Sequence, residues 1–161
     1  MRWLIIALLV TACGVTAWLA RSGSIGGSKS TEEKASVTWL ESYPDALAKA
    51  KASGRPILAD FTGSDWCDWC ARLKDEVFST KTFKEWAEAN VVLLELDYPQ
   101  VKPQSKELQK QNDDLAKKFN VEGFPMILLL NAEGVKLGQI GYEPGGPKTW
   151  IAALKTASGM K

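Results

Sequence analysis

The chain has 161 residues, a formal net charge of +1 and 45% hydrophobic residues, which suits one folded domain with a terminal extension. It contains no histidine. This excludes histidine-assisted serine or cysteine catalysis, histidine metal ligands and a histidine pH switch. Because no large basic or acidic block occurs, no nucleic-acid partner is expected.

Residues 1–20 have the pattern of a targeting segment. Arg2 precedes an apolar run over residues 3–10, which has the length of the hydrophobic region of a signal peptide. Residues 10–13 read Val-Thr-Ala-Cys and resemble the bacterial lipobox. In that motif the cysteine, here Cys13, is lipidated and becomes the mature N-terminus, which would tether the protein to a membrane.

Two other interpretations of this segment stay open. Residues 3–20 are uncharged and reach the lower length limit for an uncleaved spanning anchor. Residues 15–17 could instead form an ordinary signal-peptide cleavage site, which would give a secreted protein. All three interpretations place the rest of the chain outside the cytoplasm, on the periplasmic side of a bacterial envelope, where disulfides persist.

Residues 21–36 are rich in Ser, Gly, Lys and Glu and show no apolar periodicity. This composition predicts a flexible tether that lets the domain move away from the membrane, or a disordered tail that has no such role. The folded domain is expected over residues 37–161.

The domain alternates short apolar runs with stretches of helical spacing, which predicts an α/β class. The predicted strands are residues 37–40, 57–61, 91–97, 126–130 and 136–141. The predicted helices run from a cap at residue 42 or 43 to residue 54, and over residues 71–77, 82–89, 105–119 and 149–157. Residues 131–134 predict a hairpin turn.

The chemistry-bearing stretch is Trp66-Cys67-Asp68-Trp69-Cys70, between a predicted strand and a predicted helix. If Cys67 lies at the helix start, unpaired N–H groups and the helix dipole stabilise its thiolate, which favours Cys67 as the nucleophile. Cys70 lies one turn on and can attack the mixed disulfide that Cys67 forms. One close cysteine pair is too few for a disulfide-stapled scaffold or for a four-ligand zinc site, so no metal is expected.

The order of the elements, with Gly-Phe-Pro at residues 123–125 before the later hairpin, resembles the thioredoxin family. More narrowly, residues 63–70 are similar to a bacterial subgroup of exported thioredoxin-like proteins. The resemblance covers residues 37–157. It implies a thioredoxin fold, with a central mixed sheet flanked by helices, and dithiol–disulfide exchange with protein substrates that needs no cofactor.

The resemblance also implies a role for the Phe124–Pro125 bond. In the family this proline is cis and lies against the active-site disulfide. A cis bond turns the chain tightly and lets the backbone of Phe124 face a ligand, where it could pair with a substrate strand beside Cys67. The alternative is a trans Pro125 that merely starts a strand.

Asp60 is implied as the group that exchanges protons with the inner cysteine, because a carboxyl in an apolar site has a raised pKa. Two departures from the family pattern stand out. Asp60 precedes Cys67 by seven positions where the common spacing is six, and residues 91–97 lack the lysine often found near this aspartate. The alternative is an aspartate that hydrogen-bonds its own loop.

The residues around the cysteines predict how substrates dock and whether oxidation or reduction of substrates is favoured. Trp66, Trp69 and Phe124 are expected to form an apolar docking surface, although Trp66 could instead be a core residue that shields the disulfide. Asp68, with Asp65 nearby, should oppose formation of the thiolate. The reduction potential of the Cys67–Cys70 couple is therefore expected to lie nearer the reductase end than the oxidant end of the family's range.

These residues are compatible with three functions. The leading one is an exported, membrane-tethered thiol–disulfide oxidoreductase, monomeric, with protein substrates and a redox partner that the sequence does not identify. A redox-inert binding module of the same fold is the first alternative. A metallochaperone that uses the Cys67 and Cys70 thiolates is the second, although it lacks a third soft ligand other than Met126.

Overall fold

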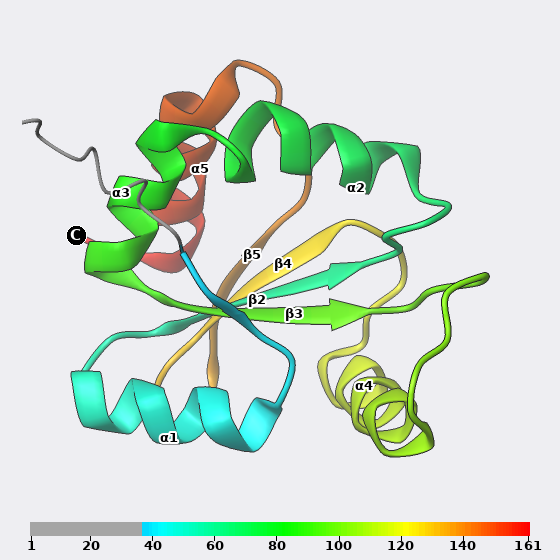
Figure 1. Cartoon of the computed structure of the whole chain (residues 1–161). Coiled ribbons are helices and arrows are strands. Elements are labelled where there is room, and N and C mark those ends of the chain that lie inside the picture. The colour runs from blue at the N-terminus through cyan, green and yellow to red at the C-terminus, as the bar shows by residue number, and fades with distance from the viewer. Residues whose placement is uncertain (1–36) are drawn as a thin grey trace, which may run out of the picture. The chain divides into compact units, whose positions relative to one another are not determined.

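The computed structural model describes residues 37–161. These residues form a five-stranded sheet in the order β1-β3-β2-β4-β5, with helices on both of its faces (Figure 1). The predicted α/β domain with a central mixed sheet flanked by helices is confirmed. The targeting segment at residues 1–20, the lipobox cysteine Cys13 and the tether at residues 21–36 lie outside the described residues.

The strands and helices follow the predicted order. The strands are β1 Trp39–Leu40, β2 Ile57–Thr62, β3 Val92–Asp97, β4 Met126–Leu130 and β5 Lys136–Ile140. The helices are α1 Tyr43–Ser53, α2 Asp68–Leu73, α3 Lys81–Asn90, α4 Lys106–Phe119 and α5 Gly146–Ser158, and a wider π-helical turn, η1 Lys74–Phe78, continues α2. Among residues 37–161, none of these helices combines the length and the apolar character needed to cross a bilayer.

Side-chain hydroxyl groups cap the start of three of the helices. The hydroxyls of Ser42, Thr80 and Ser105 each accept the backbone N–H three residues on, which satisfies a helix-start donor. At the other end of α1, Gly54 adopts a positive φ of 68° and closes the helix, as predicted from its sequence position.

The structure corrects the sequence prediction at two helices. The predicted single helix over residues 71–77 is instead α2 followed by η1, in which the N–H of Ser79 bonds to the carbonyl of Lys74. Helix α5 begins at Gly146 rather than at residue 149. Gly145 takes a φ of 111°, which reverses the chain, and Pro147 then suits the first helical turn.

The register of the sheet brings acidic side chains to one face. Strands β1, β3 and β2 are parallel to one another, whereas β4 is antiparallel to both of its neighbours, β2 and β5. Asp60 on β2 is in register with Glu95 on β3. Because side chains alternate along a strand, Asp60 points to the same face as Leu58, and Glu95 to the same face as Leu93.

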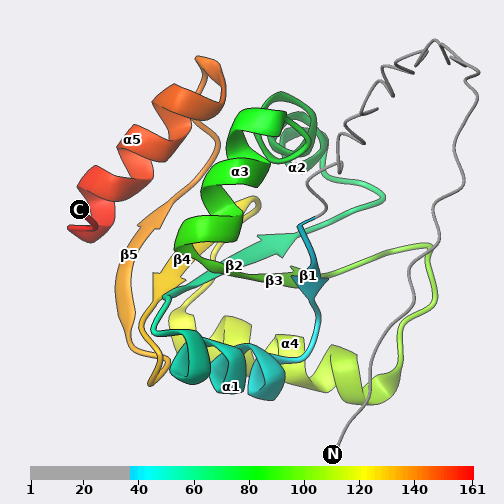
Figure 2. The same ribbon diagram turned by 60° about the vertical axis from the view of Figure 1, so that its left-hand side comes forward.

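The sheet separates two apolar cores. Helices α2, α3 and α5 cover one face (Figures 1 and 2), where Leu58, Leu93 and Trp150 are buried in one cluster. Helices α1 and α4 cover the other face, where the buried cluster includes Phe61 and Leu115. Asp60 and Glu95 therefore extend from the sheet toward the helix that carries the cysteines.

Candidate active site

Cys67 and Cys70 are joined by a disulfide at the start of α2, with their Cα atoms 5.2 Å apart. Cys67 is the N-cap residue, and its Sγ accepts the backbone N–H of Cys70 at 3.2 Å. Cys67 is half-buried, whereas Cys70 is 5% exposed. The prediction that the two sulfurs meet at the N-terminus of one helix is confirmed, and Cys67 is the more exposed of the two cysteines.

The loop before Cys67 depends on Gly63. Its carbonyl accepts the N–H groups of Trp66 and Cys67, which turns the chain into α2. The indole of Trp66 lies so close over Gly63 that a Cβ there would be 2.5 Å from an indole carbon. The indole N–H donates to the carbonyl of Tyr98 at 2.8 Å, while 42% of the residue stays exposed.

The carboxylate of Asp65 anchors this loop to the segment that follows β3. It accepts three backbone N–H groups, from Gln100, Val101 and Lys102, each at 2.9 Å. These bonds, led by that from Gln100, lower the pKa of Asp65 to about 2. The ionised charge of Asp65 is therefore directed toward these amides.

The Phe124–Pro125 bond is cis, as predicted. The ring of Phe124 packs edge-on against Trp66, with their centroids 5.7 Å apart, and also lies 5.0 Å from the ring of Tyr98. The chain around Pro125 is thus held beside the active-site loop, on the side of Trp66.

Trp69 packs against a different partner, Tyr142, at a centroid distance of 5.3 Å. Arg72 lies over both rings and pairs with Glu76 at 2.9 Å. The hydroxyl of Tyr142 donates to Glu76, which lowers the pKa of that carboxyl and raises the pKa of the phenol. Trp69 stays 54% exposed, so it presents a braced aromatic surface to solvent.

Asp60 is 7% exposed, and its Oδ1 atom has no hydrogen-bond partner among residues 37–161. Burial raises the pKa of Asp60 to about 8, with smaller contributions from the carboxylates of Glu95 and Asp97. The Lys74 ammonium acts in the opposite direction. A carboxyl with this pKa can take up or release a proton near neutral pH.

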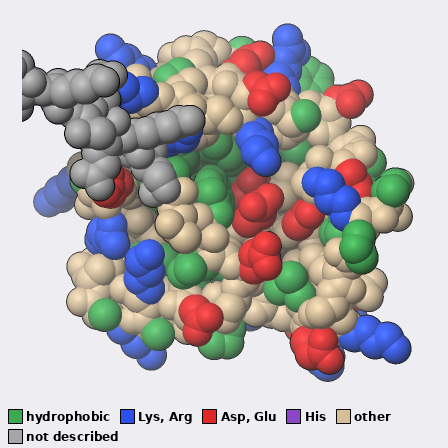
Figure 3. Space-filling view, viewed as in Figure 1, with side chains coloured by type: hydrophobic (Ala, Val, Ile, Leu, Met, Phe, Trp, Pro, Cys, Tyr) green, Lys and Arg blue, Asp and Glu red, His purple; other side chains and the backbone are tan. Residues whose placement is uncertain are grey.

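Asp60 and Cys70 line the same cavity, which has a volume of about 290 Å³ and is named the Asp60 cavity here. Trp39 and Phe78 form part of its apolar wall, and Lys74 and Glu95 are among its charged residues. On this face the surface is hollowed, with apolar side chains deep in the hollow and acidic and basic side chains around it (Figure 3).

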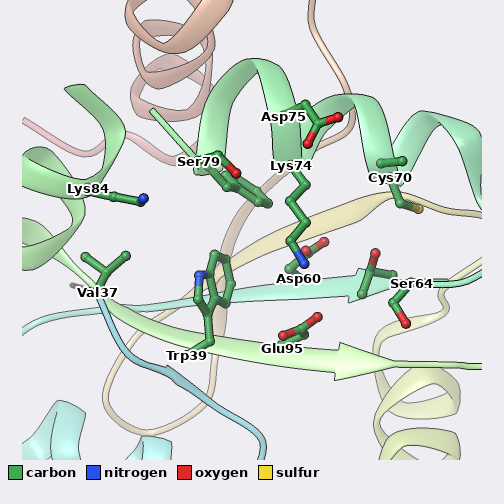
Figure 4. A pocket seen from close by; sticks show the side chains of 13 residues that line it. Val37, Trp39, Asp60, Ser64, Cys70, Lys74, Asp75, Ser79, Lys84 and Glu95 are labelled. Carbon is green, nitrogen blue, oxygen red and sulfur yellow. The ribbon is translucent and has the colours of Figure 1, made fainter. Parts of the chain in front are cut away.

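The sequence prediction missed the contribution of η1 and of two tyrosines. The lysine that β3 lacks is supplied to the Asp60 cavity by Lys74, four residues after Cys70 (Figure 4). This i, i+4 spacing was the available signal, since it puts both residues on one helical face. Tyr98 and Tyr142 lie in loops, where no periodicity marks them as neighbours of the tryptophans.

The comparisons with known proteins agree with this geometry. A family model described as a thioredoxin-like domain matches residues 43–158. "Disulfide bond reductase DsbH" of Chlamydia pneumoniae is 37% identical over 123 residues, which covers 76% of this chain and 74% of that protein. A solved structure described as "DsbH Oxidoreductase" superposes with a TM-score of 0.73 at 35% identity, covering 78% of this chain and 86% of that chain.

A second relative is a longer protein, of which this chain matches about one third. "Thioredoxin-related protein DsbJ" of Chlamydia pneumoniae is 32% identical over 113 residues, which covers 68% of this chain but 32% of that protein. The family model and the relative DsbH both extend over more than two thirds of the chain. The chain therefore belongs to the family of thioredoxin-like domains.

Proposed function

We propose that the protein reduces disulfides of protein substrates outside the cytoplasm. It is a protein-disulfide oxidoreductase of the thioredoxin-like family, and its relative DsbH carries the name of a disulfide bond reductase. The observation that carries the proposal is the Cys67–Cys70 disulfide, in which Cys67 is half-buried and the buried Cys70 lines the same cavity as Asp60.

The reaction begins from the dithiol form. The Cys67 thiolate attacks one sulfur of a substrate disulfide, and the other substrate sulfur leaves as a thiolate. Cys70 then gives its proton to the Asp60 carboxylate and attacks the Sγ of Cys67. The bond between Cys67 and the substrate breaks, its electron pair stays on the substrate sulfur, and two electrons have moved from the protein to the substrate.

The docking surface for the substrate is assigned to Trp66, Trp69, Phe124 and Pro125. Trp66 and Phe124 form one aromatic pair beside the disulfide, and Trp69 forms another with Tyr142. The exposed tryptophans supply apolar area, while the backbone of Phe124 pairs with an extended substrate segment. The protein acts as a monomer and is re-reduced by a separate redox partner.

The reducing direction is supported by the site electrostatics. The backbone N–H of Cys70 donates to the Sγ of Cys67 in the disulfide, and the same donor would stabilise a Cys67 thiolate, whereas Asp68 at the first position of α2 would oppose it. A less stabilised thiolate favours the disulfide, so the dithiol form is a better reductant.

The proposed location of the protein, outside the cytoplasm and tethered to the envelope, is based on its N-terminal sequence. The targeting pattern of residues 1–20 and the lipobox at Cys13 support export and tethering to the bacterial envelope. Replacing Cys13 with Ser should release the protein from membranes without stopping export. Retention on the membrane in that variant would favour an uncleaved anchor, and a wild-type protein already free of membranes would favour secretion.

The function is tested by insulin reduction with dithiothreitol and by the equilibrium potential of the Cys67–Cys70 couple against glutathione. Catalysed insulin reduction and a potential close to that of known reductases are expected. Metal content is measured in parallel. An inactive protein without metal would support the binding module, and an inactive protein that copurifies with copper or zinc would support the metallochaperone.

A further inference from the structure

Three charged groups surround the proton-exchanging carboxyl, and they come from two elements. Asp60 on β2 faces Glu95, with which it is in register on β3, and Asp97 lies two residues further along β3. From the opposite side, η1 extends Lys74 toward Asp60 (Figure 4). Two carboxylates therefore favour a proton on Asp60, and one ammonium group opposes it.

The position of Lys74 follows from the helix geometry. Cys70 and Lys74 are four residues apart and both line the Asp60 cavity. The π-helical turn begins at Lys74, and Val77 and Phe78 are buried in the core beyond it. The backbone of Lys74 is thus fixed, while its exposed side chain lines the cavity and points toward Asp60 (Figure 4).

The remaining charged residues of this cavity are placed differently. Asp75 also lies on η1, and Lys84 lies on α3 (Figure 4). Neither is among the charges that shift the pKa of Asp60, which are those of Glu95, Asp97 and Lys74. Lys84 therefore offers a matched control, because it is a lysine of the same cavity with no such effect.

We propose that Lys74 is a positioning residue for the exchange reaction, whose ammonium group keeps Asp60 able to accept the proton that Cys70 gives up. This inference rests on the proposed function. With a neutral residue at position 74, Asp60 holds its proton more tightly, so a smaller fraction of Asp60 is ionised at neutral pH than in the wild type. Cys70 then meets an ionised acceptor less often, and the step in which it attacks Cys67 slows.

The test separates the two cysteine steps. Reduced protein reacts with Ellman's reagent, an aromatic disulfide, and releases one aromatic thiolate when Cys67 attacks and a second when Cys70 attacks. Rapid mixing between pH 5 and pH 9 records both phases. In Lys74→Met, the pH midpoint of the second phase should rise by roughly half to one unit, with a roughly three- to tenfold slower rate at pH 7. The first phase should keep its rate.

Matched variants assign the effect to the charge. Lys74→Arg should keep the wild-type profile, and Lys84→Met should leave both phases unchanged. In an Asp60→Asn background, Lys74→Met should have no further effect, because the group that Lys74 acts on is gone. Salt at about 1 M should move the wild-type profile toward that of Lys74→Met, since an exposed ammonium is screened.

A second readout does not depend on catalysis. In the oxidised protein neither cysteine titrates, so the carboxyl carbon signal of Asp60 can be followed by NMR, and its pKa should be higher in Lys74→Met than in the wild type. Lys74→Gln gives the same comparison if the Met variant does not fold. Superimposable second-phase profiles, or an effect that persists without Asp60, would overturn the proposal. If the wild-type protein shows no exchange at any pH, the proposed function fails, and the carboxyl titration still decides whether Lys74 acts on Asp60.

Discussion

Asp97 holds Ser64 through both oxygens of its carboxylate. Oδ1 accepts the backbone N–H of Ser64 at 2.8 Å, and Oδ2 accepts its hydroxyl at 2.6 Å. Lys102 donates to the same hydroxyl at 2.9 Å. The end of β3 is therefore tied to the loop that leads into the cysteines, and the longer spacing between Asp60 and Cys67 is accommodated by side-chain bonds.

The roles of the two cysteines can be separated by trapping. Cys70→Ser should accumulate a mixed disulfide with protein substrates, because Cys67 can still attack but nothing resolves the product. Cys67→Ser should form none and should lose insulin reduction. Non-reducing gels of the two variants check this. Equal trapping by Cys67→Ser would reverse the assignment of nucleophile and resolving cysteine.

Asp60 should make stability fall as the pH rises. Its pKa is about 8 in the folded protein and about 4 in the unfolded chain, so the folded state holds one more proton between these values. The stabilisation is fully present below pH 4 and is lost as the pH rises through 8. Between pH 5 and pH 7 the expected loss is roughly 2–3 kcal/mol.

Asp60→Asn provides the comparison for this pH dependence. The amide stays neutral, so urea unfolding of the oxidised variant should show a flatter dependence than the wild type over pH 5 to 8. The variant should be the more stable of the two at pH 8, and the difference should shrink toward pH 5. Parallel pH profiles of the two proteins would mean that Asp60 ionises normally.

Asp65 should hold the segment of residues 100–102 in place. Asp65→Ala removes the acceptor of three backbone N–H groups, so amide hydrogen exchange at Gln100, Val101 and Lys102 should accelerate roughly tenfold or more. Because the pKa of Asp65 is lowered, the same protection should be lost in the wild type only as the pH falls toward 2. Asp68→Ala, a change to a nearby exposed acid, serves as the control.

Gly63 should tolerate no side chain. In Gly63→Ala the new Cβ would meet the indole of Trp66 at 2.5 Å, so the ring must shift and the bond to the Tyr98 carbonyl must lengthen or break. A loss of about 1–3 kcal/mol in stability is expected, together with slower insulin reduction. Trp66→Phe in the same background should recover part of the stability, and no recovery would place the clash elsewhere.

The helices and strands were predicted well from the sequence, because residues that cap or terminate a helix act within a few positions. Ser42, one of the two residues predicted to cap α1, begins that helix, and Gly54 ends it as predicted. The cis Phe124–Pro125 bond was predicted from the family resemblance and is confirmed. The start of α5 was missed, because the positive φ of Gly145 is set by the loop rather than by helix propensity.

The residues around Asp60 were harder to predict, because they depend on register and on helix winding. Residues 71–77 were expected to be a regular helix, and a π-helical turn at Lys74 leaves no mark in the apolar spacing. Glu95 lies within an apolar run, and its pairing with Asp60 depends on how β2 and β3 align. Asn112 is buried and donates to the carbonyl of Asp97, and its position in a charged helix likewise gave no indication of this.

Strand β1 pairs with β3 at Leu93 and Leu94 alone, so the remainder of β3 has no outer strand beside it in the described sheet. An uncovered strand edge is a template on which another chain can polymerise. Glu95 and Asp97 occupy that stretch, and their charges discourage such growth. Substitutions of Glu95 by apolar residues therefore carry a risk of self-association, and light scattering should accompany any kinetic study of them.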